Sequence, residues 1–219
     1  KNYFPSVFIL LLSLGVLTGF YGCGSSERED ITFFGGKIKN PKGKYIYLSK
    51  ENKVIDSARL DDHNKFAFEL DSIKEGLYVF NHGPEFQYLY LQPTDSVLMY
   101  LNTWDFDESL IFSGKGSAKN NFLINLYLQQ EKTEKNFKGN YRLDEQEFSD
   151  LIDAGIQKQL DLYDIFVNDL EDPPSSHFDK LAKTGIYFPF YFMKEYYPYN
   201  HMWMMKSKGF PELSDEFYA

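Results

Sequence analysis

Residues 54–70 read VIDSARL, DDHN and KFAFEL in succession, and this stretch decides the fold class of the region around it. In its last part, Phe66 and Phe68 alternate with polar or small residues, which is the period of a β-strand with one buried face. The middle part is typical of a tight turn, because Asn64 tolerates a left-handed backbone and aspartate bonds nearby backbone groups. The stretch therefore predicts two strands joined as a hairpin, one on each side of the turn.

The same pattern continues on both sides of this hairpin. Short runs rich in Tyr, Phe, Ile and Val recur up to residue 113, separated by clusters of Gly, Pro, Asn and Asp. Further strands are expected at residues 77–81, 85–92, 96–102 and 109–113. About eight strands at this spacing predict an antiparallel β-sandwich or open barrel over residues 31–114.

The period of the apolar residues changes after Gly114. Across residues 115–219, apolar side chains lie three to four positions apart, which is the spacing of one helix face. We expect Ser117 to cap the first of these helices, because serine is favoured at that position. The predicted fold class is therefore α+β, with a β-rich region followed by a helical region.

Two further helices are expected in the second half. One opens at Asp144, where Glu147 completes the pattern of a capping box three residues on. The other begins near Ser175 or the next serine and runs toward Lys194. Pro189 is expected to kink or divide it, because proline lacks the N–H donor and clashes with the preceding turn.

Cys23 is the only cysteine of the chain, and a largely apolar, uncharged stretch separates it from Lys1. A positive end, an apolar core and a small residue at Gly22 are the parts of an export signal that is cleaved before a cysteine. We expect residues 1–22 to be a lipoprotein signal peptide, Cys23 to carry lipid and residues 23–30 to be a flexible acidic tether.

Two alternatives for the first 22 residues stay open. They are a signal anchor that remains as a membrane span and a buried core helix, because a short apolar run fits each of these. A cysteine with two or three acyl chains stays on its membrane, whereas one chain binds only marginally. The lipid therefore predicts a place in the cell envelope, on the outer membrane, facing the periplasm or the cell surface.

The chain is acidic, with 23 basic against 32 acidic residues and a formal net charge of −9. Nucleic-acid binding depends on clustered Lys and Arg that release counterions from phosphates, and the sequence has no basic stripe of that kind. We expect no nucleic-acid partner. With Cys23 assigned to the anchor, no thiol remains for a disulfide.

Several segments resemble the β-rich domain of unknown function that precedes the thioredoxin domain in many exported lipoproteins of the Bacteroidetes. Asn64-Lys65 stands where that family usually has Asp-x-Asp/Asn-Gly. The motifs are structural, and the resemblance covers about residues 31–130. It rests on Gly36-Lys37-Ile38, Val54-Ile55-Asp56-Ser57, Phe66-Ala67-Phe68, Leu77-Tyr78, Phe112-Ser113-Gly114, Ser117 and Asn120-Asn121.

The resemblance implies an alternative function. Similar proteins continue past a helical region into a thioredoxin domain with a Trp-Cys-x-x-Cys active site. This chain has no such motif, and disulfide exchange needs a thiolate and a partner sulfur. We expect the given chain to be redox-inert, and the alternative is that it forms the accessory front part of a thiol-disulfide oxidoreductase whose thioredoxin domain lies beyond residue 219.

Residues 186–205 hold nine aromatic side chains and four methionines. Tyr and Trp combine a large contact area with a polar group, which is typical of interaction hot spots. A partner or ligand surface is therefore predicted at Tyr196, Tyr197, Tyr199 and Trp203. The alternative is that the segment fills the core of a helix hairpin, which aromatic residues at helical spacing usually do.

No other pattern indicates chemistry. His201 with Met202, Met204 and Met205 would suit monovalent copper, but methionine so readily fills core gaps that packing is expected instead. The acids at residues 105–108 are expected to form a solvated turn. We expect no catalytic residue, no metal and no cofactor.

The sequence therefore predicts a membrane-anchored exported lipoprotein that works without catalysis as a binding, spacing or dimerising module. Its expected partners are the membrane, through lipid on Cys23, and a protein partner or second copy. Besides the oxidoreductase alternative, a surface glycan-binding lipoprotein would be favoured if the rings of residues 186–205 formed an exposed platform.

Overall fold

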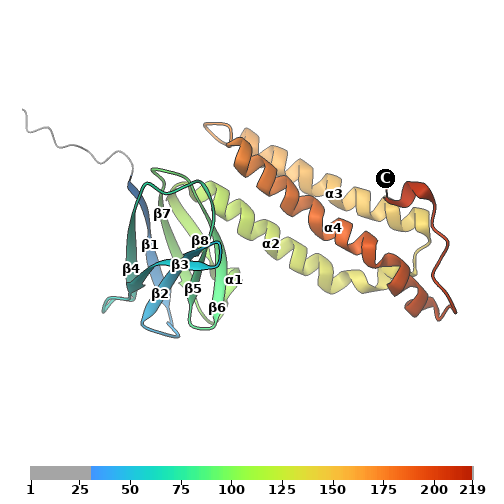
Figure 1. The fold of residues 1–219 in the computed structure, drawn as a ribbon, viewed down its shortest axis with the longest axis horizontal. Helices are drawn as coiled ribbons and strands as arrows, with labels where there is room; N and C mark the ends of the chain where they lie inside the picture. The colour runs from blue at the N-terminus through green and yellow to red at the C-terminus, as the bar shows by residue number, and fades with distance from the viewer. Residues whose placement is uncertain (1–30, 219) are drawn as a thin grey trace, which may run out of the picture.

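Eight strands pair into two four-stranded sheets in the computed structural model, which describes residues 31–218 (Figure 1). The sheet orders are β4-β1-β7-β8 and β3-β2-β5-β6, and every pair is antiparallel except β1 with β7. The predicted α+β class with an N-terminal β-sandwich is confirmed. The strands are β1 (Ile31–Lys39), β2 (Tyr45–Lys50), β3 (Lys53–Arg59), β4 (Lys65–Asp71), β5 (Gly76–His82), β6 (Glu85–Leu91), β7 (Ser96–Asn102) and β8 (Ile111–Lys115).

Residues 54–70 form a corner between the two sheets. β3 pairs with β2 in one sheet and β4 pairs with β1 in the other, so the prediction of a hairpin was wrong. The turn itself has the expected chemistry: Asn64 has a left-handed φ of 59°, and Asp61 Oδ1 accepts hydrogen bonds from the backbone N–H groups of His63 and Lys65, both at 2.8 Å. Local turn signals therefore fixed the reversal but not the strand partners.

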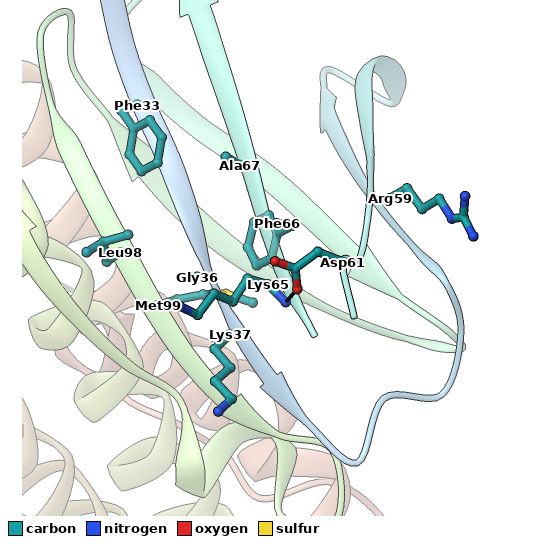
Figure 2. Close-up of a pocket in the computed structure, with 10 residues that line it drawn as sticks. All are labelled: Phe33, Gly36, Lys37, Arg59, Asp61, Lys65, Phe66, Ala67, Leu98 and Met99. Atoms are coloured by element: carbon teal, nitrogen blue, oxygen red, sulfur yellow. Dashed lines mark hydrogen bonds between the residues drawn. The ribbon is translucent and has the colours of Figure 1, made fainter. Parts of the chain in front are cut away.

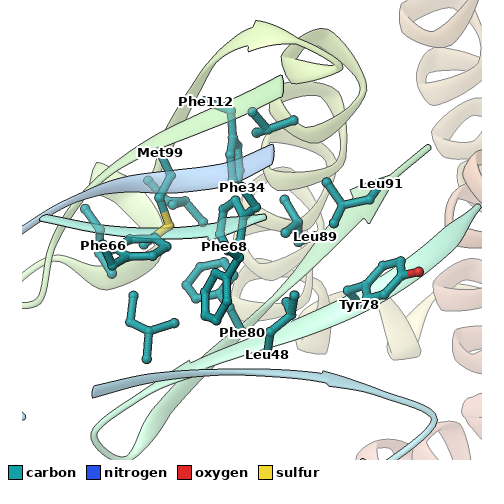
Figure 3. Close-up of a cluster of buried hydrophobic side chains, with 14 of the residues drawn as sticks. Phe34, Leu48, Phe66, Phe68, Tyr78, Phe80, Leu89, Leu91, Met99 and Phe112 are labelled. Atoms are coloured by element: carbon teal, nitrogen blue, oxygen red, sulfur yellow. The ribbon is translucent and has the colours of Figure 1, made fainter. Parts of the chain in front are cut away.

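The core of the sandwich lies between the two sheets (Figure 3). Alternation along each strand places one set of side chains inside, as expected from a period of two. On β4, Phe66 and Phe68 are buried whereas Lys65 and Ala67 are exposed. Rings dominate the packing, with Phe34 lying 5.3 Å from Phe66 and 5.9 Å from Phe68 between centroids.

Three long helices form an arm that projects from one end of the sandwich (Figure 1). α2 (Ser117–Phe137) leads away from the sandwich, α3 (Glu145–Asn168) returns beside it, and α4 (Ser176–Met205) runs outward again. Short elements complete the chain: α1 (Phe106–Ser109), η1 (Lys138–Arg142) and η2 (Asp215–Tyr218). The four-residue helix α1 replaces part of the solvated turn expected at residues 105–108, because the ring of Phe106 is buried in the sandwich core.

The three helices begin with different caps. Asp144 accepts a hydrogen bond from the N–H of Glu147 at 2.9 Å, which confirms the predicted start of α3. Ser175 Oγ accepts from the N–H of Phe178 at 3.1 Å and caps α4. At α2 the predicted cap, Ser117, is instead the first helical residue, and Gly116 occupies the cap position with a φ of 92°.

α4 is longer than predicted and contains both Pro189 and Pro198. The expectation that the helix ends near Lys194 was wrong, because buried side chains continue the packing stripe to Tyr197, beyond the first proline. Packing against α3 is close: a Cβ at Gly155 of α3 would lie 2.4 Å from Phe190 Cε1. Tertiary contacts therefore offset the hydrogen bonds that the prolines remove.

Two further hydrophobic clusters stabilise the arm. One joins the base of the arm to the sandwich through Tyr90, Tyr163 and Phe178. The other lies at the far end, where Phe148 packs among α4 and η2. Together with the sandwich core, the part of the chain that the structure describes thus holds three hydrophobic clusters.

The membrane-related predictions fall outside this part of the chain. The expected signal peptide at residues 1–22, the lipidation of Cys23 and the tether at residues 23–30 lie outside the described residues. Within residues 31–218, none of the helices combines the length and the apolar character that a membrane span requires.

Candidate functional site

Five aromatic side chains lie along the outward side of α4, and we call this set the α4 aromatic face. Each recurs three or four positions after the last, so all point to one side of the helix. The opposite side carries the buried residues Ile186, Phe190 and Met193. The members and their exposed fractions are Phe188 at 66%, Phe192 at 50%, Tyr196 at 47%, Tyr199 at 58% and Trp203 at 60%.

Tyr197 does not belong to this surface, which corrects the prediction that placed it there. It is 1% exposed, its hydroxyl donates to the carbonyl of Leu143 at 2.8 Å, and its ring lies 4.2 Å from that of Phe148. Burial raises the pKa of Tyr197 to about 12. Because neighbouring residues on a helix point about 100° apart, Tyr197 points away from the side that carries Tyr196. The other three predicted surface residues, Tyr196, Tyr199 and Trp203, are exposed.

The rings of the face contact one another. Centroids lie 4.5 Å apart for Phe192 and Tyr196 and 6.4 Å apart for Phe188 and Phe192. Lys138 Nζ lies 5.3 Å above the ring of Trp203, in the range of a cation–π contact. These contacts restrict the rings before any partner binds, which lowers the entropy cost of association.

A hollow lies at each end of the α4 aromatic face. The hollow beside Phe188 has a volume of about 470 Å³, with Tyr187 and Tyr191 on its wall. The hollow beside Trp203 measures about 240 Å³ and is lined by Tyr141 and Tyr199 among others. The surface is therefore not a flat ridge, and it can receive a protruding side chain at either end.

The histidine and two of the methionines at the end of α4 are engaged in packing. His201 Nδ1 lies 3.0 Å from the carbonyl oxygen of Tyr141, and its ring lies 5.0 Å from that of Tyr197. Met202 and Met204 are half-buried, whereas Met205 is exposed, so the expectation of packing does not hold for Met205. Among residues 31–218, no three His, Cys, Asp or Glu side chains converge on a common point where they could hold a metal ion.

A polar cluster joins the arm to the sandwich, and sequence reasoning did not find it. Glu75 Oε1 accepts hydrogen bonds from Tyr90, from Ser175 and, at 2.7 Å, from Gln92 Nε2. The Tyr90 hydroxyl also lies 3.0 Å from His177 Nδ1. Glu75 and Ser175 are a hundred residues apart, so no local pattern could have indicated their contact.

We call this polar cluster the joint between sandwich and arm. Its hydrogen bonds determine the charge of Glu75. Partial burial opposes ionisation of Glu75, but the donors from Ser175, Tyr90 and Gln92 together hold its pKa below the usual value. Burial and the hydrogen bond to Glu75 raise the pKa of Tyr90. Glu75 is thus an ionised acceptor at neutral pH, held between a strand of the sandwich and the first turn of α4.

A groove crosses the outer surface of the β4-β1-β7-β8 sheet (Figure 2). Its apolar part lies over Gly35, whose register neighbours are Ala67 on β4 and Leu98 on β7. At the next outward position, Lys37 and Lys65 face each other across β1 and β4. Like charges placed directly opposite repel each other, but the carboxylate of Asp61 also lines the groove and attracts Lys65. The groove, of about 610 Å³, is therefore apolar over Gly35 and carries charges of both signs at one end.

No family model matches the chain, and no curated protein or solved structure is significantly similar to it.

Proposed function

We propose that this protein is a lipid-anchored, non-catalytic binding module of the cell envelope, whose helical arm presents the α4 aromatic face to a protein partner. One observation carries the proposal: a 30-residue helix has one side in the core and five half-exposed aromatic rings on the other. An exposed aromatic surface of this size is typical of an interaction site.

The anchoring part of the proposal rests on the sequence. Cys23 follows a stretch with the parts of an export signal, and lipid on this cysteine would hold the protein at a membrane. Seven residues separate Cys23 from the first strand, so the chain from Cys23 to Ile31 spans at most about 28 Å when extended. In this proposal the sandwich lies near the membrane and acts as the base of the arm.

The non-catalytic part rests on what the polar side chains do. The richest cluster of titratable groups, around Glu75 and Tyr90, is occupied by hydrogen bonds that join the arm to the sandwich. Ser175, the hydroxyl nearest to it, caps α4. These groups therefore act in holding the two parts together, and the binding surface lies elsewhere on the arm.

Cross-linking in intact envelopes tests the proposed binding surface. Wild-type protein is expected to give a discrete cross-linked product that a variant with Phe192→Ser and Tyr199→Ser loses, because both rings are removed from the middle of the face. Ile165→Ser is the matched control, since Ile165 is 58% exposed on α3. Loss of the product in the control as well would contradict the proposal.

The anchor is tested separately by fractionation. Wild-type protein is expected with the membranes, whereas Cys23→Ala is expected in the aqueous fraction or as uncleaved precursor, since lipid can no longer be attached. Mature Cys23→Ala protein that still sediments with the membranes would refute the lipid anchor.

A second candidate function follows from the resemblance of about residues 31–130 to the domain that precedes thioredoxin domains. In that case the sandwich and arm would be the accessory part of a thiol-disulfide oxidoreductase, and the α4 aromatic face would contact the enzyme domain. A reading frame that continues past residue 219 into a Trp-Cys-x-x-Cys segment would favour this function.

A further inference from the structure

We infer that the partner of the α4 aromatic face is a second copy of the chain, bound in antiparallel orientation about a twofold axis that passes close to Tyr196. The inference rests on the proposed role of this face as an interaction surface and names its occupant. A twofold interface brings one patch against itself, so the patch must be complementary to its own reversed copy.

The spacing of the rings meets that requirement. Counted from Tyr196, Phe192 lies four residues back and Tyr199 three residues on, while Phe188 lies eight back and Trp203 seven on. Reversal about Tyr196 therefore maps each ring onto another ring to within one residue. In an antiparallel pair, Phe188 of one copy faces Trp203 of the other, Phe192 faces Tyr199, and Tyr196 faces Tyr196.

The area is sufficient for a specific pair. A fully buried aromatic side chain accounts for about 150–250 Å², so five that are half exposed present roughly 500 Å² per copy. Two copies would bury roughly 1,000 Å², the size at which specific protein–protein interfaces begin. The face extends about 22 Å along α4, since each helical residue rises 1.5 Å.

The surface has the composition of an interface centre, where charged residues are depleted. Between Phe188 and Trp203 the only Lys, Arg, Asp or Glu residues are Lys194 and Glu195. Lys194 is buried, with its Nζ 5.2 Å above the ring of Phe217, so it does not contribute charge to the face. Glu195 is exposed, three residues after Phe192 and four before Tyr199, so it is the one charged side chain that borders these rings.

The hollow beside Phe188 lies outside this contact. Its lining residues are Asp179, Lys180, Lys183, Thr184, Tyr187, Phe188 and Tyr191, most of which lie on a neighbouring side of α4. In the antiparallel pair it therefore flanks the ring of Phe188 and stays open.

Cysteine cross-linking tests the register directly. A chain that begins at Ser25 keeps all three hydrophobic clusters, which lie within residues 31–218, and contains no cysteine. A single cysteine introduced on the surface is then the only thiol. We expect Tyr196→Cys to form a disulfide-linked dimer about tenfold faster than the control Ile165→Cys, because pairing raises the effective thiol concentration.

Mixed pairs distinguish the orientations. Phe188→Cys is expected to cross-link with Trp203→Cys in preference to itself, since the antiparallel register brings these positions together. Preferential self-linking of Phe188→Cys would replace the antiparallel register with a parallel one and overturn the inference. Dimer formation by Tyr196→Cys no faster than by Ile165→Cys would overturn it as well.

The two proposals fail in different ways. If Tyr196→Cys does not cross-link while the envelope product is still lost in the Phe192→Ser and Tyr199→Ser variant, the second copy is wrong and the binding surface stands. If that product also survives the double substitution, the proposed function itself is wrong. Circular dichroism of each variant confirms that the arm remains helical in these measurements.

Discussion

A single glycine fixes the point at which the sandwich passes into the arm. Gly116 has a φ of 92°, and a Cβ there would lie 2.5 Å from Cγ of the buried Asp95. Gly116→Ala is expected to lower the free energy of unfolding by about 2 kcal/mol, because it adds left-handed strain and a collision. Urea unfolding measures the change, and Gly139→Ala, with open space around its Cβ position, is the control. Equal stability of the two variants would contradict this account.

The same position shows why single residues resist prediction from sequence. The preference of serine for caps pointed to Ser117, and nothing near it in the sequence indicated that Asp95 would lie against its neighbour. Tyr197 is a second residue whose position was predicted wrongly. The 100° step of a helix separates it from Tyr196, and its spacing of seven from the buried Phe190 puts it on the core side, but aromatic content alone did not say which side faces the core.

Among the elements, α3 depends on its N-terminal cap. Asp144 accepts the N–H of Glu147, and the helix behind it carries Phe148 in the cluster at the far end of the arm. Asp144→Ala is expected to cost about 1 kcal/mol of stability, the usual value for a lost cap. Asp153→Ala, an exposed position inside the same helix, is expected to change stability by less than about 0.5 kcal/mol. Thermal unfolding of both variants makes the comparison, and an equal loss would show that the cap is not the cause.

The elements themselves were largely predictable because their signals are local. Alternation placed Phe66 and Phe68 in the core, and the capping pattern located the start of α3. Strand partners were not predictable, because the turn at residues 61–64 has the same chemistry in a hairpin as in a corner between sheets. The position at which α4 ends was predicted wrongly, because its packing partners lie on α3 and η2, far away in sequence.

The whole molecule depends on the joint between sandwich and arm, which brings together residues that no sequence pattern connects. The α4 aromatic face was foreseen in part, as Tyr196, Tyr199 and Trp203, because its rings are close in sequence. The joint was not, because Glu75, Tyr90 and Ser175 come from three separate segments. A binding surface on one helix can thus be predicted from sequence, whereas contacts between distant segments become known only from the three-dimensional structure.

We expect low pH to weaken the joint between sandwich and arm, because Glu75 becomes protonated. Its pKa in the folded protein is lower than the ordinary value, so its ionised form contributes stability above the unfolded pKa of about 4.5, and that contribution is lost as the pH falls through the folded pKa. Asp95 has the opposite sign: burial raises its pKa, so the stability linked to its protonated form is present at low pH and lost as the pH rises. The acid profile of the wild type alone therefore mixes both effects.

The difference in free energy of unfolding between wild type and Glu75→Gln reports the contribution of Glu75 to the joint alone. Glutamine keeps the shape but loses the charge-assisted hydrogen bonds, so we expect the variant to be less stable by about 1 kcal/mol at pH 7. The difference should begin to shrink as the pH falls below the unfolded pKa of about 4.5 and should vanish below the lower pKa of the folded protein, where the wild-type carboxyl is protonated in both states. Urea unfolding at a series of pH values measures it, with exposed Glu171→Gln as the control. A difference that stays constant across this range would mean that the ionised carboxylate does not hold the arm to the sandwich.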